Sequence, residues 1–251
     1  MDWTALRAVK EADSQQRAAA PLSEVTPSIR DFSQFVTTQK QELGLIPALK
    51  RADPDTGQAW PELDIVALAQ ACDDTEVGAI GVYTEPSLFG TSSDDMRAIS
   101  ERVTTPLLAL DLVLHDSQLH HARLCGADAV LLWAGALDAP ALARLMTTAR
   151  SIHVAPVVMA RTLDELHLAL AAESFIIGLA SPNGKLDVAH VSALAAHVPR
   201  QKTIISLDEL RTPEEADALL GEVDAALVSQ RVLDAADVEG SLSNVVQTGS
   251  R

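Results

Sequence analysis

Cysteine and basic residues are both scarce in this sequence. Two cysteines, Cys72 and Cys125, occur in 251 residues, and their spacing matches no metal-ligand pattern. Two isolated thiols argue against a disulfide scaffold and favour a reducing compartment. Lys and Arg number 19 against 35 Asp and Glu, which gives a net charge of −16. Nucleic acids and anionic membrane surfaces are therefore poor partner candidates.

Long apolar runs are absent as well. No stretch approaches the ~20 apolar residues of a membrane span, and no basic segment followed by an apolar one opens the chain as in a secretory signal. We therefore expect a cytoplasmic protein. Hydrophobic residues still make up 47% of the chain, which is enough for a large core in one domain of this length.

Short apolar runs alternate with amphipathic segments rich in Ala and Leu. Eight such runs, each followed by a plausible helix, are typical of repeated β–α–β units. Their nearly continuous apolar character suits parallel strands that are covered on both faces. These features predict an α/β fold, a single (β/α)8 TIM barrel with functional residues at the C-terminal ends of its strands. The predicted strands are 45–49, 77–83, 106–112, 129–132, 156–159, 175–179, 202–206 and 225–228.

The predicted barrel spans residues 45–240. Residues 1–44 precede the first strand and contain VTPSIRDFSQFVTTQ, which we interpret as part of a helical N-terminal extension packed on the barrel. Residues 241–251 are predicted to form a fraying C-terminal tail. Helix N-caps are predicted at Thr162, at Thr212 before Pro213, and at Asp116 or Ser117.

The stretch LIPALKRADPDTG, residues 45–57, joins a strand to an acidic turn. Lys50 and Arg51 at the strand end suit an anionic ligand. Asp53 and Asp55 then stand in the turn where such a ligand is expected. This strand therefore either has a catalytic role or keeps only the fold of a catalytic strand without its chemistry.

Four segments resemble motifs of indole-3-glycerol phosphate synthases, the ring-closing lyases of tryptophan biosynthesis. KRADPDTG resembles K-R-x-S-P-S-x-G, and AIGVYTEPSLFGTS resembles the second-strand motif of that family. PLLALDLVLHDSQLHHARLCGADAVLLWAGAL resembles the segment around strands 3 and 4, and RTPEEADAL resembles the helix start after strand 7. The resemblance runs from about residue 27 to 233 and implies a TIM barrel.

The same resemblance implies catalytic positions at the strand ends, of which Lys50 alone is retained. The lysine that acts as general acid on strand 3 falls on Leu110, and the glutamate that acts as general base on strand 5 falls on Met159. Neither replacement can transfer a proton, and loss of one such group costs ~10²–10⁴-fold in rate. The other replaced positions are Ala48, Ala180, Leu207 and Asp208.

The positions implied to bind phosphate are also changed. The loop-1 serine falls on Asp53, the glycine after strand 7 on Glu209, and the Gly-Ser step after strand 8 on Ser229 and Gln230. A carboxylate ~4 Å from a phosphate charge costs about 4 kcal/mol at an effective dielectric constant of about 20. The sequence therefore disfavours a phosphorylated substrate.

Other implied pocket positions remain suited to a ligand: Arg51, Glu85, Phe89, Asp111 and Leu131. Lys50 either still binds a ligand or forms a structural ion pair with Asp53, Glu85 or Asp111. Trp133, Arg161 and Arg231 follow strands, where they can bind an organic acid or a protein partner.

Histidines and nucleotide motifs add little. His115, His120 and His121 lack the i, i+4 spacing of a metal site and are expected to be solvated helix residues. No P-loop or dinucleotide fingerprint occurs, and NGK at 183–185 is expected to form a turn. We expect neither a cofactor nor a metal.

Hypotheses of three kinds remain open. The first is a catalytically inactive relative of the family that acts as a binding or regulatory protein, with a protein partner in aromatic amino acid metabolism. The second is an enzyme with changed chemistry on a non-phosphorylated substrate, either uncharged or cationic, bound in an acidic barrel mouth. The third is the family's own lyase reaction, carried by substituted residues.

Overall fold

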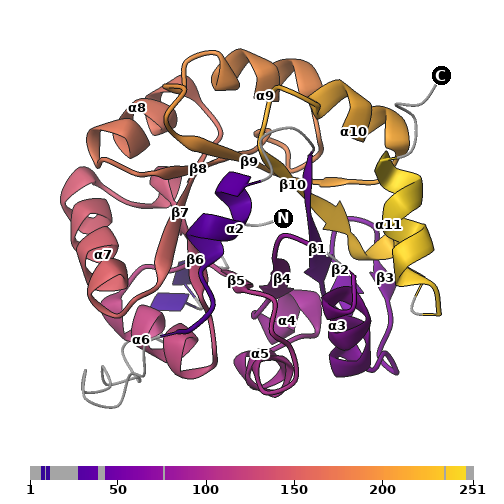
Figure 1. The fold of residues 1–251 in the computed structure, drawn as a ribbon. Coiled ribbons are helices and arrows are strands. Elements are labelled where there is room, and N and C mark those ends of the chain that lie inside the picture. Colours follow the sequence, from indigo (N-terminus) through magenta and orange to yellow (C-terminus); the bar gives the residue numbers. More distant parts are fainter. Residues whose placement is uncertain are drawn as a thin grey trace.

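The computed structural model describes residues 7–8, 10–11, 28–38, 43–75, 77–234 and 236–246. Eight parallel strands close into one barrel in the order β1-β10-β9-β8-β7-β6-β5-β4. Helices surround the barrel on its outside (Figure 1). The predicted TIM barrel is confirmed.

Each of the eight predicted apolar runs overlaps a barrel strand. The strands are β1 (Gly44–Leu49), β4 (Ile80–Tyr83), β5 (Leu107–Leu110), β6 (Ala129–Trp133), β7 (Ala155–Ala160), β8 (Ile176–Leu179), β9 (Thr203–Leu210) and β10 (Ala225–Ser229). Two differences affect the site. Strand β9 continues four residues beyond its predicted end at 206, and the predicted turn after β1 contains a small antiparallel hairpin of β2 (Ala52–Asp53) and β3 (Gln58–Ala59).

The helices alternate with the strands as a β/α repeat requires. They are α2 (Phe32–Thr38), α3 (Ile65–Asp73), α4 (Pro86–Phe89), α5 (Ser93–Ser100), α6 (Asp116–Leu124), α7 (Ala139–Ser151), α8 (Leu163–Ala171), α9 (Val188–Ala195), α10 (Pro213–Leu219) and α11 (Val238–Val246), with short 3-10 turns at η2 (Ala134–Ala136) and η3 (Gln230–Val232). The predicted caps at Thr162 and Thr212 are confirmed, since each side chain accepts from the backbone N–H three residues later. Helix α6 differs: its N-cap is His115, because the Gln118 side chain accepts from the backbone N–H groups of Leu114 and His115.

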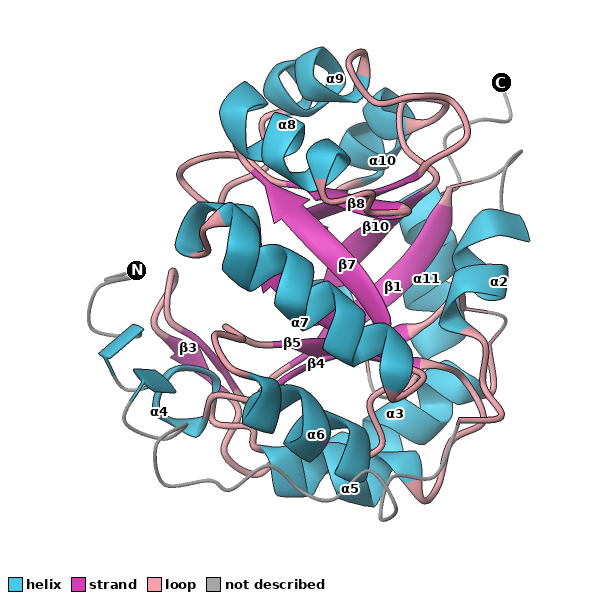
Figure 2. Ribbon diagram, turned by 90° about the vertical axis from the view of Figure 1, so that its left-hand side faces the viewer, coloured by secondary structure: helices cyan, strands magenta, loops and turns pink. Residues whose placement is uncertain are grey.

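Helix α2 closes the N-terminal end of the barrel. Its Phe32 and Val36 are each 1% exposed and pack with the side chains inside the barrel, such as Ile46 and Leu108. The Phe35 ring lies against Gly78, where a Cβ atom would stand 3.1 Å from the ring. Figure 2 shows α2 at one end of the barrel and the α4 and β3 region at the other. The strand ends that carry function are therefore on the side away from α2.

The N-terminal extension contacts both ends of the barrel. At the N-terminal end of the barrel, Arg30 Nε lies 2.7 Å from an Asp128 carboxylate oxygen. The Arg30 guanidinium also donates to the carbonyls of Ser100, Val103 and Gly126. At the C-terminal end of the barrel, Lys10 is 4% exposed and pairs with carboxylates that follow β4 and β5. Residues 12–27 lie outside the described residues.

The C-terminal boundary lies later than expected. Helix α11 continues past residue 240, where the predicted tail begins, and its Leu242 and Val245 are buried against the core. Apolar residues at spacing i, i+3 bury one face of this helix. Residues 247–251 lie outside the described residues.

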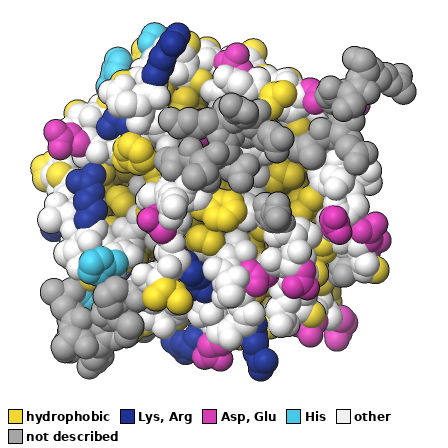
Figure 3. Space-filling model, in the orientation of Figure 1, with side chains coloured by type: hydrophobic (Ala, Val, Ile, Leu, Met, Phe, Trp, Pro, Cys, Tyr) yellow, Lys and Arg dark blue, Asp and Glu magenta, His cyan; other side chains and the backbone are white. Residues whose placement is uncertain are grey.

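Both cysteines are buried thiols that form no disulfide within the described residues. Burial raises the pKa of Cys72 to about 12, so this thiol is not a nucleophile at neutral pH. Within the described residues, no helix has the length and apolar character needed to cross a membrane. Figure 3 shows the α2 face, with Asp and Glu side chains spread over its right-hand side and Lys and Arg mainly toward the opposite and lower edges.

Candidate functional site

A cavity of about 560 Å³ opens at the C-terminal ends of the strands, the end at which a TIM barrel carries its site. This volume is within the usual range for small-molecule pockets. Its lining includes apolar side chains from five strands: Leu110, Leu131, Met159, Leu207 and Leu227. The predicted location of the site at the barrel mouth agrees with this cavity.

The positions implied for the general acid and base carry apolar side chains in the cavity wall. Leu110 is 4% exposed and Met159 is 6% exposed. Leu110 packs over Gly81 of the neighbouring strand, where a Cβ atom would lie 2.9 Å from its Cδ1. Leu207 packs in the same way over Gly178. Ala180 also lines the cavity, so these positions form an apolar surface without proton carriers.

Lys50 is held by a carboxylate that the sequence analysis did not pair with it. Its Nζ lies 2.6 Å from Glu209 Oε1 and 3.9 Å from Asp53 Oδ2. The Tyr83 hydroxyl donates to the same Glu209 oxygen at 2.8 Å. The interpretation of Lys50 as a structural ion pair is supported, but its main partner is Glu209. The predicted partners Glu85 and Asp111 bind another lysine.

The surroundings of Tyr83 on this side of the cavity change the pKa of its hydroxyl group. Burial raises the pKa of its hydroxyl well above the usual value, and the negative charges of Glu209, Asp53 and Asp55 raise it further. Its ring stacks on Phe89 with centroids 4.1 Å apart and lies 5.0 Å from Lys50 Nζ. Three carboxylates, those of Glu209, Asp53 and Asp55, therefore lie near this hydroxyl group.

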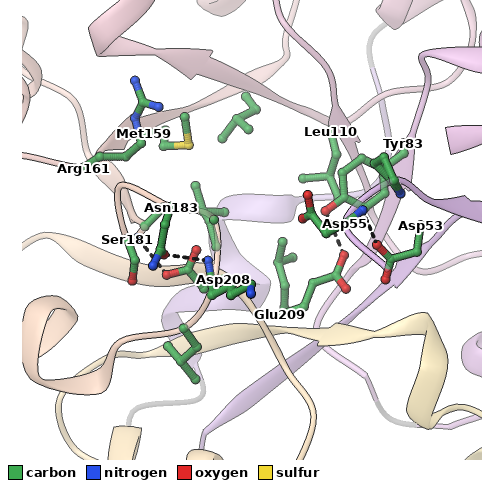
Figure 4. A pocket seen from close by; sticks show the side chains of 18 of the residues that line it. Asp53, Asp55, Tyr83, Leu110, Met159, Arg161, Ser181, Asn183, Asp208 and Glu209 are labelled. Atoms are coloured by element: carbon green, nitrogen blue, oxygen red, sulfur yellow. Dashed lines mark hydrogen bonds between the residues drawn. The ribbon is translucent and has the colours of Figure 1, made fainter. Parts of the chain in front are cut away.

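Asp53 and Glu209 each keep one carboxylate oxygen without a hydrogen-bond donor among the described residues. Asp53 Oδ1 accepts from the Asp55 backbone N–H at 3.0 Å and supports the β2–β3 turn, whereas Oδ2 has no donor. Glu209 Oε1 accepts two hydrogen bonds and Oε2 accepts none. Figure 4 shows Glu209, Tyr83, Asp53 and Asp55 on the same side of the cavity.

Glu85 and Asp111 pair with Lys10 from the N-terminal extension. The Lys10 Nζ lies 2.8 Å from Glu85 Oε2 and 2.6 Å from Asp111 Oδ1. Burial favours neutral Lys10, but the two carboxylates outweigh it and raise its pKa. Burial likewise raises the pKa of Asp111 despite Lys10. Sequence patterns did not reveal this contact, because Lys10 stands about a hundred positions from Asp111 and in no recognisable motif.

The other side of the mouth carries Asp208, Ser181 and Arg161 (Figure 4). Asp208 is 3% exposed and accepts from the Ser181 backbone N–H at 2.7 Å. Burial raises its pKa. Arg161 pairs with Glu165 at 3.5 Å and lies 5.9 Å from the Trp133 ring centroid. Arg211 also lines the cavity and was not foreseen, although it directly follows β9.

Several predicted positions do not line the cavity. Arg51 turns away and pairs with Asp95 at 2.8 Å, and Ala48 is buried inside the barrel. Ser229 and Gln230 are buried, and the Gln230 side-chain oxygen accepts from the Lys50 backbone N–H at 3.4 Å. Protein groups therefore bond to one another where the resemblance implies a phosphate cradle. Arg231 is exposed outside the cavity.

The predicted turn at 183–185 is confirmed, with Gly184 at φ +70°, and it contributes to the cavity rim. The expectation of solvated histidines is wrong for His120, which is 7% exposed and lies on the inward side of α6 with Leu119. His121 is half-buried, and its Nε2 lies 3.7 Å from Cys125 Sγ. Among the residues that the structure describes, no three His, Cys, Asp or Glu side chains are arranged to hold a metal ion.

Comparison with known proteins gives one consistent result. The family model for indole-3-glycerol phosphate synthase matches residues 4–245. An indole-3-glycerol phosphate synthase of Mycobacterium leprae (strain Br4923) is 29% identical over 253 residues, covering 98% of this chain and 93% of its own. One from Mycobacterium sp. (strain KMS) is 30% identical over 94% of this chain and 84% of its own. Indole-3-glycerol phosphate synthase 1 of Streptomyces coelicolor is 31% identical over 82% of this chain and 78% of its own.

Proposed function

The chain belongs to the indole-3-glycerol phosphate synthase family, and on that premise we propose that it is a binding or regulatory barrel without the family's lyase activity. The observation that carries this proposal is the apolar wall made by Leu110 and Met159. These are the positions where the family resemblance puts the general acid and the general base. Ring closure, decarboxylation and dehydration need proton carriers within hydrogen-bond reach of the substrate.

The loss of phosphate binding supports the same proposal by a separate route. Glu209 and Asp53 place carboxylates at positions implied to contact phosphate. Glu209 is already paired with Lys50, with 2.6 Å between Glu209 Oε1 and Lys50 Nζ. A phosphate would have to displace that ion pair and approach two carboxylates in a partly buried site. The ligand of this cavity is therefore a molecule without a phosphate group.

The same proposal includes a partner and a place of action. We expect the chain to act in the cytoplasm and to bind an enzyme of aromatic amino acid metabolism, in keeping with its family. The reduced, buried thiols of Cys72 and Cys125 suit a reducing compartment. A pull-down from cytoplasmic extract, with partners identified by mass spectrometry, tests this part.

A sensitive lyase assay tests the central claim. Purified protein is incubated with the carboxyphenylamino-deoxyribulose phosphate substrate, and indole-containing product is measured by fluorescence. We expect no turnover above a no-protein blank and no heat on titration with the substrate. Because the named relatives are synthases, one of them run in parallel is the positive control. Turnover by this chain would overturn the proposal.

A further inference from the structure

Two buried carboxylate oxygens, on residues that line the cavity, have no hydrogen-bond donor among the described residues. The side chains of Asp53 and Glu209 are 2% and 8% exposed, and both residues line the cavity. Asp53 Oδ2 and Glu209 Oε2 accept no hydrogen bond from the described residues. An oxygen of an ionised carboxylate in a partly dehydrated site favours a charged donor, and an ammonium group offers three N–H bonds.

The surrounding charge selects a cation. Lys50 contacts both carboxylates, but one positive charge cannot neutralise Asp53 and Glu209 together. The exposed Asp55 adds a negative charge on the same side of the cavity (Figure 4). Of the described residues that line the cavity, seven are acids and four are bases: Asp53, Asp55, Glu85, Asp111, Asp208, Glu209 and Glu215 against Lys50, Arg161, Lys185 and Arg211. Lys10 pairs with Glu85 and Asp111 from outside this lining, and with it the acids still exceed the bases, seven to five.

Next to these carboxylates, the cavity offers flat apolar surface. The stacked rings of Tyr83 and Phe89 form one wall. Leu110 packs beside Tyr83, its register partner on the neighbouring strand. Aromatic rings bind well on such a surface, in offset-stacked or edge-to-face geometry. A ligand that places its charge at Glu209 thus has an apolar surface for the rest of its body.

We infer that this cavity binds a small aromatic primary amine. Its ammonium group donates to Glu209 Oε2 and Asp53 Oδ2, and its ring lies against Tyr83, Phe89 and Leu110. The inference rests on the proposed function, since it assigns a ligand class to the cavity that no longer takes a phosphate. A divalent cation is the poorer occupant, because no three acidic or histidine side chains of the described residues converge on one point.

Calorimetry with three matched probes tests the ligand class. Phenethylamine, phenylethanol and phenylpropanoate share one ring and nearly one size, and they carry a positive, a neutral and a negative group. We expect phenethylamine to bind about tenfold more tightly than phenylethanol, the typical effect of a charged hydrogen bond. We expect no heat from phenylpropanoate. Tighter binding of phenylpropanoate or phenylethanol than of the amine would overturn the inference.

Two neutralising variants test the site. Asp53→Asn and Glu209→Gln keep the size of each side chain, and each is expected to weaken phenethylamine binding about tenfold. Glu222→Gln makes the same chemical change on the exposed surface outside the cavity and should leave the affinity unchanged. Glu209→Gln also removes the partner of Lys50, so its melting temperature is checked first. Asp53→Asn keeps a side-chain oxygen for the Asp55 N–H, and unchanged affinity in this variant would overturn the inference.

The lyase assay separates the two proposals. Amine binding without lyase turnover supports both. Absence of amine binding and of turnover overturns the amine inference and leaves the proposed function standing. Turnover of the phosphorylated substrate overturns the proposed function, and the amine inference falls with it.

Discussion

At the residue scale, Glu209 changes what the retained Lys50 can do. A lysine at the end of β1 would bind an anion, but here its ammonium group lies 2.6 Å from a carboxylate that is itself nearly buried. The Tyr83 hydroxyl donates to the same oxygen. A retained catalytic residue type is therefore weak evidence of retained chemistry when its neighbour has changed.

Asp208 gives a prediction about pH. Its pKa is raised in the folded state by burial, so the folded chain holds a proton that the unfolded chain releases near pH 4. Its contribution to stability is therefore present at low pH and is lost as the pH rises through the folded pKa. Asp208→Asn, whose amide oxygen can still accept from Ser181, is expected to raise the free energy of unfolding at pH 7 more than at pH 3.5.

Urea denaturation at the two pH values measures this difference. Asp187→Asn is an unsuitable control because Asp187 caps α9. Asp55→Asn is suitable, since Asp55 is exposed in the same mouth. An equal gain at both pH values in Asp208→Asn would show that burial does not raise this pKa.

Lys10 gives a prediction about stability. Lys10→Met leaves Glu85 and Asp111 without their cation, and breaking a buried ion pair in this way costs about 3 kcal/mol of unfolding free energy. The exposed Lys185→Met is the control and should change stability by less than about 0.5 kcal/mol. Chemical denaturation measures both. Equal stability of Lys10→Met and the parent chain would mean that the extension does not contact the mouth in solution.

At the element scale, sequence patterns located the strands better than their ends. The apolar runs identify all eight, because parallel strands covered on both faces read as continuous hydrophobic stretches. Strand β9 runs on to Leu210, and its polar residues Asp208 and Glu209 conceal the continuation. The β2–β3 hairpin was read as a plain turn, since two-residue strands leave no periodic signal.

The site was predictable in part through the family resemblance. That resemblance implies functional positions at Leu110, Met159 and Glu209, and all three line the cavity. The Lys10 pairing and the Glu209 bond to Lys50 are contacts between residues far apart in sequence. Such contacts depend on three-dimensional packing that one chain's pattern does not encode.

Helix α2 supplies a prediction at the same scale. Phe32 is 1% exposed and fills the N-terminal end of the barrel, so Phe32→Ala is expected to cost about 3–5 kcal/mol of unfolding free energy. The fully exposed Ile29→Ala is the matched control, with an expected change of less than about 0.5 kcal/mol. Thermal and chemical unfolding distinguish the two. Equal effects would mean that α2 does not seal the barrel.

At the scale of the whole molecule, the barrel scaffold is intact, while the positions implied for proton transfer and phosphate binding carry other residue types. Restoring only the proton carriers, with Leu110→Lys and Met159→Glu, is therefore expected to give no lyase turnover. Asp53 and Glu209 still oppose phosphate in this variant. Adding Asp53→Ser and Glu209→Gly should produce measurable heat on titration with the phosphorylated substrate. Turnover by the two-substitution variant would show that the carboxylates do not exclude phosphate.

The extension that contacts both barrel ends has a consequence for biosynthesis. Lys10 and Arg30 are translated before their partners, because Glu85, Asp111 and Asp128 all come later in the sequence. During synthesis Lys10 has no native carboxylate partner until Glu85, which follows β4, has left the ribosome, and Arg30 has none until Asp128, just before β6, has followed. The extension therefore docks at both barrel ends only after the segment before β6 has emerged, and a ribosome pausing within β4 would hold the nascent chain with Lys10 and Arg30 undocked.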